Sequence, residues 1–313
     1  MQIVNDITLV LRSSGERTEV ACLNILDEIF GLDVQVIRAV PFSEALRQSL
    51  IAGVEKGKTL TFIVDADVLP SKEGVLQLLE YMNARPHLFE AQGEVMDKFF
   101  MVPRAAGVHL YRTAFIPEAL QFIPESTASL RPETSMIKAM EKAGKPQGQT
   151  SILVGLHDFE QDYEKIFRTA WFHSQKHHYL YRKYFLDEWR KRRYDADYKI
   201  ALAGLSQGLV SRKQVYADIS CFNSELSTFF QAYNLEQKEP LVGYSGKDVT
   251  EMLESLFHSV HYVKTVWRHS QLLKRKELSK SFRYKLLRNF SSPYCYAVSR
   301  FMQLKLKVRH TVW

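Results

Sequence analysis

Two carboxylates, Asp65 and Asp67, directly follow the apolar run TFIV at residues 61–64. Runs of β-branched and aromatic residues are typical of buried parallel strands, and open α/β sheets bind ligands at the carboxyl ends of such strands. Residues 59–71 contain no Lys or Arg. The pair therefore predicts a pocket that holds a divalent cation through oxygen atoms. Because Asp also favours turns, a solvated turn at the strand end is the alternative.

A second candidate ligand, His157, follows the apolar run ILVGL at residues 152–156. An imidazole beside two carboxylates suits Mn²⁺ better than Mg²⁺, which prefers oxygen ligands throughout. Asp158 competes with His157 for the same role. The alternative is that these two residues form a helix entry with Asp158 as the N-cap.

Arg12 ends a short apolar segment and precedes Ser13, Ser14 and Gly15. A basic residue beside a helix N-terminus can hold a diphosphate or the edge of a uracil ring. Arg12 and Glu16 are therefore candidates for binding a nucleotide. The alternative is an ordinary surface pair of Arg and Glu, which contributes little to stability.

An alternation of strands and helices must position these residues. Strands are expected at 7–11, 34–40 and 60–64, with helices at 16–30, 41–57 and 71–81, as in a doubly wound nucleotide-binding half. Further strands are expected at 99–102, 107–111 and 151–156. Helical patterns dominate beyond residue 159. The sequence thus predicts an α/β domain at residues 1–160 and a helical, basic extension at residues 161–313.

The first strand, the helix with Ala45-Leu46-Arg47 and the motif Val64-Asp65-Ala66-Asp67 together resemble nucleotide-sugar glycosyltransferases of the GT-A fold, in particular bacterial family 2-like members. The resemblance covers residues 5–160, about half of the chain. It implies a GT-A-type, Rossmann-like mixed sheet flanked by helices, with a mainly helical C-terminal extension.

The same resemblance implies roles for individual residues. Asp65, with Ala66 beside it, would contact the ribose or a metal-bound water, Asp67 would ligate the metal, and His157 would complete the metal site. Arg47 matches only part of the family's Arg-Asn-x-Gly element, because Gln48 follows it. The implied donor is a nucleotide-diphosphate sugar, UDP-linked, and the implied acceptor is a glycan or a lipid-linked molecule.

An inverting transfer needs a general base that deprotonates the acceptor hydroxyl. Glu133 is the main candidate, ahead of Glu94, Asp97 and Glu125. The family carries an acidic pair at a comparable helix start, whereas the segment Arg131-Pro132-Glu133-Thr134 has one acid. The alternative is that Glu133 only favours the first turn of a helix through the helix dipole.

Composition and charge bound the class of protein. Apolar residues make up 46% of the 313 residues, as in a globular protein. Three widely spaced cysteines (Cys22, Cys221 and Cys295) suggest neither disulfides nor zinc. Residues 1–11 resemble a strand more than a signal peptide, and no apolar run approaches the length of a membrane span. These features favour a cytoplasmic protein.

The basic charge gathers at the end of the chain. Residues 261–313 contain 13 Lys or Arg residues and one acid, so the remainder has 29 basic residues against 34 acidic ones. Apolar and basic residues are interleaved there, which suits an anionic membrane surface such as the inner membrane face. Nucleic acid and a solvated helical bundle are the alternatives.

Two other functions remain open from the sequence. A nucleotidyltransferase on a similar scaffold would also use metal and phosphates, although residues 13–17 make a poor phosphate-binding loop. A non-catalytic protein whose basic end binds membrane or nucleic acid is the other alternative.

Overall fold

The computed structural model describes residues 6–125, 131–177, 179–211, 230–231, 234, 236–258, 268–269 and 271–272. The chain divides into two compact units. One unit is Met1–Gln161 with Pro240–Ser259, and the other is Asp162–Glu239 with Val260–Trp313. The first unit thus includes helix α10, which comes from the range expected for the helical extension.

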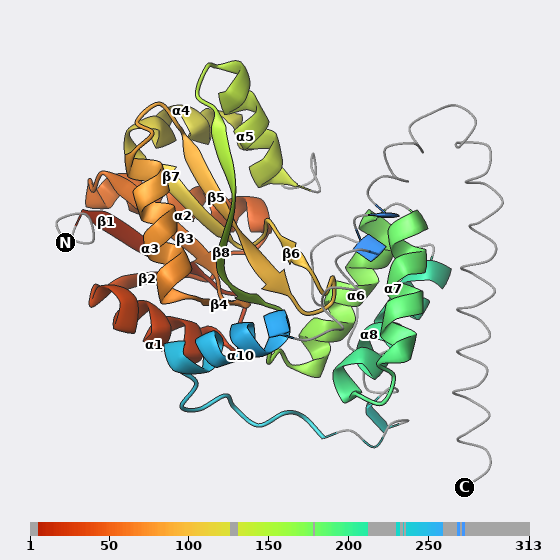
Figure 1. The fold of residues 1–313 in the computed structure, drawn as a ribbon. Helices are drawn as coiled ribbons and strands as arrows, with labels where there is room; N and C mark the ends of the chain where they lie inside the picture. Colours follow the sequence, from red (N-terminus) through yellow and green to blue (C-terminus); the bar gives the residue numbers. More distant parts are fainter. Residues whose placement is uncertain are drawn as a thin grey trace, which may run out of the picture. The chain divides into compact units, whose positions relative to one another are not determined.

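A mixed β-sheet forms the centre of the first unit (Figure 1). Among the described residues its strand order is β2-β1-β3-β7-β5-β8-β4, and β6 pairs with β5. β1 is parallel to β2 and β3, β7 runs antiparallel to β3, and β4 runs antiparallel to β8. The strands are β1 (Ile7–Arg12), β2 (Val34–Ile37), β3 (Leu60–Asp65), β4 (Val68–Pro70), β5 (Glu90–Asp97), β6 (Pro103–Arg104), β7 (Val108–Arg112) and β8 (Gln147–His157).

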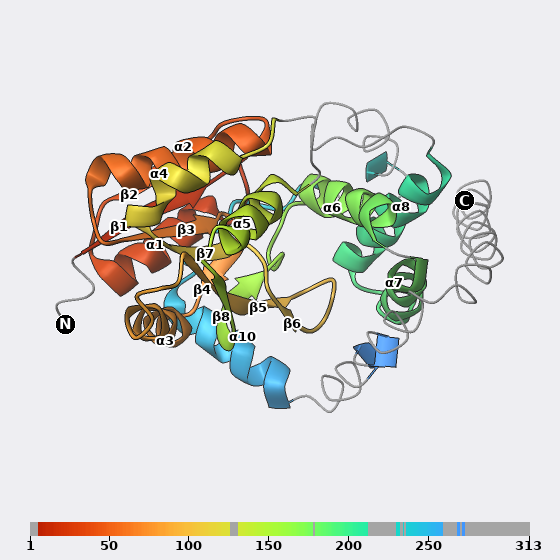
Figure 2. The same ribbon diagram turned by 90° about the horizontal axis from the view of Figure 1, so that it is seen from above.

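Helices cover both faces of this sheet (Figure 2). One face packs against α1 (Glu19–Phe30) and α3 (Lys72–Asn83), and α10 (Gly246–His258) lies against β4 and β8. The other face packs against α2 (Phe42–Lys56), α4 (Ile116–Ala119) and α5 (Pro132–Lys142), with short 3₁₀ turns η2 (Thr113–Phe115) and η3 (Leu120–Phe122) between them. The predicted α/β fold, a mixed sheet flanked by helices, is confirmed.

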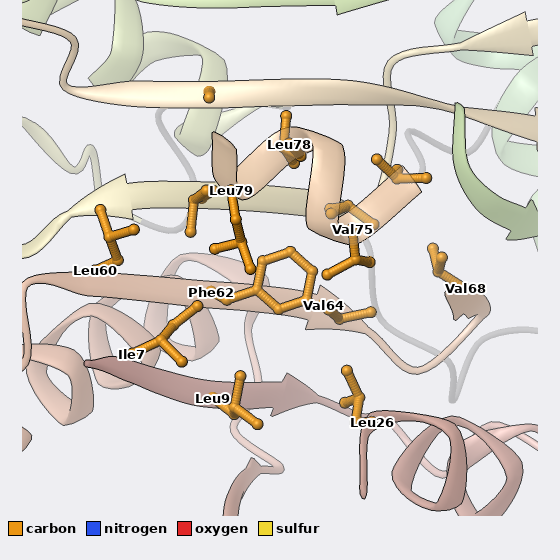
Figure 3. Packing of buried hydrophobic residues seen from close by; sticks show 14 of the residues in the cluster. Ile7, Leu9, Leu26, Leu60, Phe62, Val64, Val68, Val75, Leu78 and Leu79 are labelled. Atoms are coloured by element: carbon orange, nitrogen blue, oxygen red, sulfur yellow. The ribbon is translucent and has the colours of Figure 1, made fainter. Parts of the chain in front are cut away.

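Successive side chains of a strand point to opposite faces of the sheet, and this alternation decides which residues contact which helices. Ile7 and Leu9 of β1 and Phe62 of β3 point toward α1 and α3, where they pack with Leu26 and Leu78 (Figure 3). The alternate positions, such as Val10 and Ile63, point toward α2 and α5. Arg12 and Asp65 continue this second set, so both belong to the α2–α5 face.

The second unit is helical in its described part. It contains α6 (Tyr163–Lys176), α7 (Tyr179–Lys191) and α8 (Ala196–Val210), and α6 packs closely along α8. Asp162 caps α6 by accepting a hydrogen bond from the backbone of Lys165. Phe185 stacks on the fully buried Trp189 at a centroid distance of 4.9 Å. Among the described residues, no helix has both the length and the apolar character that a membrane span requires.

One predicted strand is wrong, and three strands were missed, of which β4 and β6 are short. The apolar run at 99–102 is a buried turn, in which Asp97 accepts hydrogen bonds from the backbone N–H groups of Phe99 and Phe100 and Met101 has φ +61°. The longest of the missed strands is β5, which carries the polar residues Glu90 and Gln92 inside the fold. Most of the basic C-terminal segment, with its expected contacts, lies outside the described residues.

Candidate functional site

Each residue of the turn Asp65-Ala66-Asp67 makes a hydrogen bond through its backbone. The N–H of Asp65 donates to the carbonyl of Gly107 (2.8 Å), and that of Ala66 donates to the carbonyl of Arg12 (2.8 Å). The carbonyl of Ala66 accepts from the hydroxyl of the buried Thr18, and that of Asp67 accepts from the N–H of Asp158 (3.0 Å). The turn is therefore a fixed platform that presents both carboxylates.

Gly107 permits this close packing around the turn. It has φ +64°, and a Cβ atom there would lie 2.6 Å from Cγ2 of Val68 and 3.5 Å from the side chain of Asp65. Both the left-handed backbone and the lack of room make a larger residue costly at this position.

Antiparallel pairing of β4 with β8 brings Asp67 to residues ninety positions later. Val68 lies opposite His157 in this pairing, so Asp67 reaches His157 and Asp158. One ligand atom from each of the three residues lies within 4.8 Å of the others. Asp158 has φ +61°, a conformation that costs non-glycine residues about 1–3 kcal/mol and that concentrates at functional sites.

His157 is oriented by Asp97, a fully buried carboxylate at the end of β5. Nδ1 of His157 lies 2.9 Å from Oδ2 of Asp97, whereas Nε2 lies 3.7 Å from Oδ2 of Asp67. Arg104 donates to the same Oδ2 of Asp97 from Nε (2.6 Å). With Nδ1–H directed to Asp97, the lone pair of a neutral imidazole at Nε2 faces Asp67. This is the arrangement by which carboxylates orient metal-binding histidines.

The residues present fit a divalent cation. Within the described part of the chain, Oδ1 of Asp67 is buried without a hydrogen-bond partner, and Oδ2 of Asp158 is buried 3.3 Å from Nδ1 of His157. Burial, together with the charges of Asp158 and Asp65, raises the pKa of Asp67 to about 7. Burial acts to lower the pKa of His157, but the charges of Asp158 and Asp67 raise it well above its usual value. Such crowded, unsatisfied carboxylates are relieved by a positive ion.

Arg12 links the turn to helix α5. It is only 4% exposed; its Nε donates to Oδ1 of Asp65 (2.7 Å) and its Nη1 donates to Oε1 of Glu133 (3.1 Å). The pairing with Asp65 follows from the parallel register of β1 and β3, in which the two residues are partners. The guanidinium also lies over the ring of Phe42, 4.9 Å from its centroid.

Glu133 has contacts at both of its carboxylate oxygens. Besides Arg12, the hydroxyl of Tyr111 donates to Oε1 (2.7 Å), and Nε2 of His109 lies 3.0 Å from Oε2. Burial acts to raise the pKa of Glu133, but Arg12 and His109 lower it well below its usual value. A carboxylate with so low a pKa has little affinity for a proton, so these contacts favour holding Arg12 over accepting a proton from an acceptor.

Glu16 and Arg47 lie in other surroundings. Glu16 accepts hydrogen bonds from the hydroxyl of Ser13 (3.0 Å) and the N–H of Ser14 (2.7 Å), so it braces the loop that follows β1. Arg47 of α2 donates to the carbonyl of Leu120 in η3 (3.3 Å). The metal and nucleotide roles predicted for all these residues stay predictions.

Several residues of this site were missed or underrated from the sequence. The sequence presents Asp97 only as a weaker candidate base and gives no signal for Arg104, His109 and Tyr111. Buried polar residues in a strand would have been the signal for them. That signal becomes visible only once β5 and β7 are known to lie inside the sheet.

No protein-family model and no curated protein matches the chain. Solved structures similar to it include a mannosyltransferase from Pyrobaculum calidifontis in complex with GDP-Man and Mn²⁺, at 11% identity and a TM-score of 0.36, covering 95% of this chain and 87% of that one. Another is a glycosyltransferase involved in glycosylation of the PBCV-1 major capsid (12%, TM-score 0.34, 46% and 82% covered). A third is a CMP-2-keto-3-deoxy-manno-octonic acid synthetase with CTP (12%, TM-score 0.34, 49% and 92% covered). Likenesses this distant transfer no residue role.

Proposed function

We propose that this chain is a metal-dependent glycosyltransferase that moves a sugar from a nucleotide-diphosphate donor, UDP-linked, to a glycan or lipid-linked acceptor. The observation that carries the proposal is the group Asp67, His157 and Asp158, in which Oδ1 of Asp67 is buried without a partner, beside Asp65, which Arg12 holds in place. It lies where β3 ends in the sheet, the position at which α/β sheets bind nucleotides.

In this proposal Asp67, His157 and Asp158 hold Mn²⁺ or Mg²⁺, and Asp97 sets the orientation of His157. When bound, such a cation supplies positive charge that offsets the charge of a departing diphosphate. Asp65 contacts the ribose or a metal-bound water, and Arg12 fixes the direction of Asp65. Ala66, Glu16 and Arg47 stay in the proposed nucleotide-binding set, with Glu16 supporting the loop after β1.

The general base is a separate question. Glu133 was the candidate from the sequence, and that role remains a prediction. Its three contacts and its lowered pKa support a role in holding Arg12.

The test incubates the full chain with a panel of nucleotide sugars and Mn²⁺ and measures release of the nucleoside diphosphate. We expect metal-dependent release from one donor, abolished in Asp67→Ala and unchanged in Asp27→Ala, an exposed acid on α1. Unchanged turnover in Asp67→Ala would overturn the metal role. Release of pyrophosphate from a nucleoside triphosphate, without sugar transfer, would replace the proposal with nucleotidyl transfer.

We further propose that the basic segment 261–313 brings the enzyme to an anionic membrane surface, with the protein otherwise in the cytoplasm. The support is its charge, 13 basic residues against one acid, interleaved with apolar residues. Co-sedimentation with vesicles containing anionic lipid should decrease when salt is raised, and it should be lost when residues 261–313 are deleted. Equal binding to neutral vesicles, or tighter binding to nucleic acid, would contradict this proposal.

A further inference from the structure

A chain of five buried or half-buried charged residues runs along the α2–α5 face of the sheet, beginning at Asp65. Asp65 accepts from Arg12 (2.7 Å), Arg12 donates to Glu133 (3.1 Å), Nε2 of His109 meets Glu133 (3.0 Å), and Nδ1 of His109 meets Glu90 (2.8 Å). Glu90 is fully buried and His109 is 5% exposed. The members alternate in sign when His109 is protonated.

Strand register explains why these residues meet. His109 of β7 lies opposite Ile63, a residue of the α2–α5 face, and Glu90 of β5 lies opposite Tyr111 of the same face. Glu133 reaches the chain from the first turn of α5, above these strands. Four strands and one helix therefore contribute to a single polar line within an otherwise apolar layer.

Stability alone does not account for this line. Removing ions from water costs several kcal/mol each, and a buried ion pair replaced by well-packed apolar residues is often as stable or more stable. What a linked set of charges does provide is a fixed direction for each member, because displacing one leaves its neighbour's charge unpaired. Only Asp65, at the end of the line, has a side chain with substantial exposure, 27%, against 11% or less for the other four.

We infer that His109 and Glu133 are positioning residues, which act through Arg12 to hold the carboxylate of Asp65 in the orientation that a nucleotide diphosphate donor requires. The inference rests on the proposed function for the identity of the ligand. It makes the interior of the sheet, as well as the loops at its edge, a determinant of donor affinity.

A double-mutant cycle tests the inference. Binding of UDP, GDP and CDP with Mn²⁺ is measured by calorimetry for wild type, His109→Gln, Arg12→Met and the double variant. We expect His109→Gln to weaken the best nucleotide about tenfold, a factor that corresponds to 1.4 kcal/mol. In the Arg12→Met background the same change should have no further effect, because His109 acts through Arg12. Affinity for Mn²⁺ alone should stay at the wild-type value.

The matched control is Thr113→Val. It removes a buried hydrogen bond between the hydroxyls of Thr113 in η2 and Thr61 in β3 (2.9 Å) and leaves the line of charged residues intact, so nucleotide affinity should not change. The inference would be overturned if Thr113→Val weakened nucleotide binding as much as His109→Gln does. It would also be overturned if the loss of affinity in the double variant equalled the product of the losses in Arg12→Met and His109→Gln. An unchanged affinity in His109→Gln would also overturn it.

Failure of the proposed function gives a different pattern. If wild type binds none of the nucleotides, the proposed function is refuted, and the same four proteins are compared by denaturant unfolding. Non-additive free energies of unfolding for Arg12→Met and His109→Gln would then support coupling through Glu133, and additive ones would overturn it.

Discussion

Replacing Asp97 by Asn tests whether the metal site depends on a residue that does not itself ligate. Asp97 is fully buried and accepts from Phe99, Phe100 and Arg104, and it faces Nδ1 of His157 at 2.9 Å. Asn keeps one acceptor oxygen for the two backbone N–H groups. Its amide group then faces Arg104 and His157, where a donor replaces a charged acceptor.

The expected result is a weaker metal site in a folded protein. An amide N–H directed at Nδ1 favours the tautomer with the proton on Nε2, and a protonated Nε2 cannot bind a cation. Losing such an orienting partner typically costs 10–100-fold in metal affinity, which is about 1.4–2.7 kcal/mol. The loss should appear as a larger dissociation constant for Mn²⁺, measured by titration with the electron paramagnetic resonance signal of the free ion as the readout.

Glu90→Gln is the matched control, because it converts another fully buried, histidine-bound carboxylate of the same strand. Glu90 belongs to the line of charged residues that begins at Asp65, so Glu90→Gln should leave the affinity for Mn²⁺ unchanged. The reasoning is refuted if Asp97→Asn retains native circular dichroism and binds Mn²⁺ as wild type does. It is also refuted if Glu90→Gln weakens binding equally.

Two further predictions concern stability. Gly107→Ala should lower the free energy of unfolding by about 1–3 kcal/mol through backbone strain, with an added cost for the contact with Val68. The control is Gly144→Ala, which has φ +79° and nothing within 4 Å of the added Cβ, so it measures the backbone strain alone. Equal losses for the two variants in denaturant unfolding would contradict the packing argument. Although burial opposes it, the charges of Glu133 and Glu90 raise the pKa of His109 from 6.5 to about 10, so its stabilising charge is fully present below pH 6.5 and is lost as pH rises to 10. The difference in unfolding free energy between wild type and His109→Gln should therefore shrink by up to about 1.4 kcal/mol per pH unit over that window, and a constant difference would disprove it.

Local sequence patterns were sufficient for β1, β3 and the helices between them. Their apolar residues follow strand or helix periods closely, because each element packs an apolar face against the same layer. The pattern failed at β5 and at the apolar run after it. β5 carries Glu90, Gln92 and Asp97 inward because their side-chain partners come from other strands, and no local rule contains those partners.

The sequence by itself determined the α/β class and the end of β3 as the place of Asp65 and Asp67. A strand of apolar residues followed by acids is a local fact, whereas the pairing of β1 with β3 is what places Arg12 beside Asp65. Only the tertiary structure decided which distant residues complete the site. Pairing of β4 with β8 sets Asp158 beside Asp67, and the sheet order sets Asp97 behind His157 and Glu133 above Arg12. These contacts depend on hydrogen-bond register between strands far apart in the chain, and register is a property of the folded sheet.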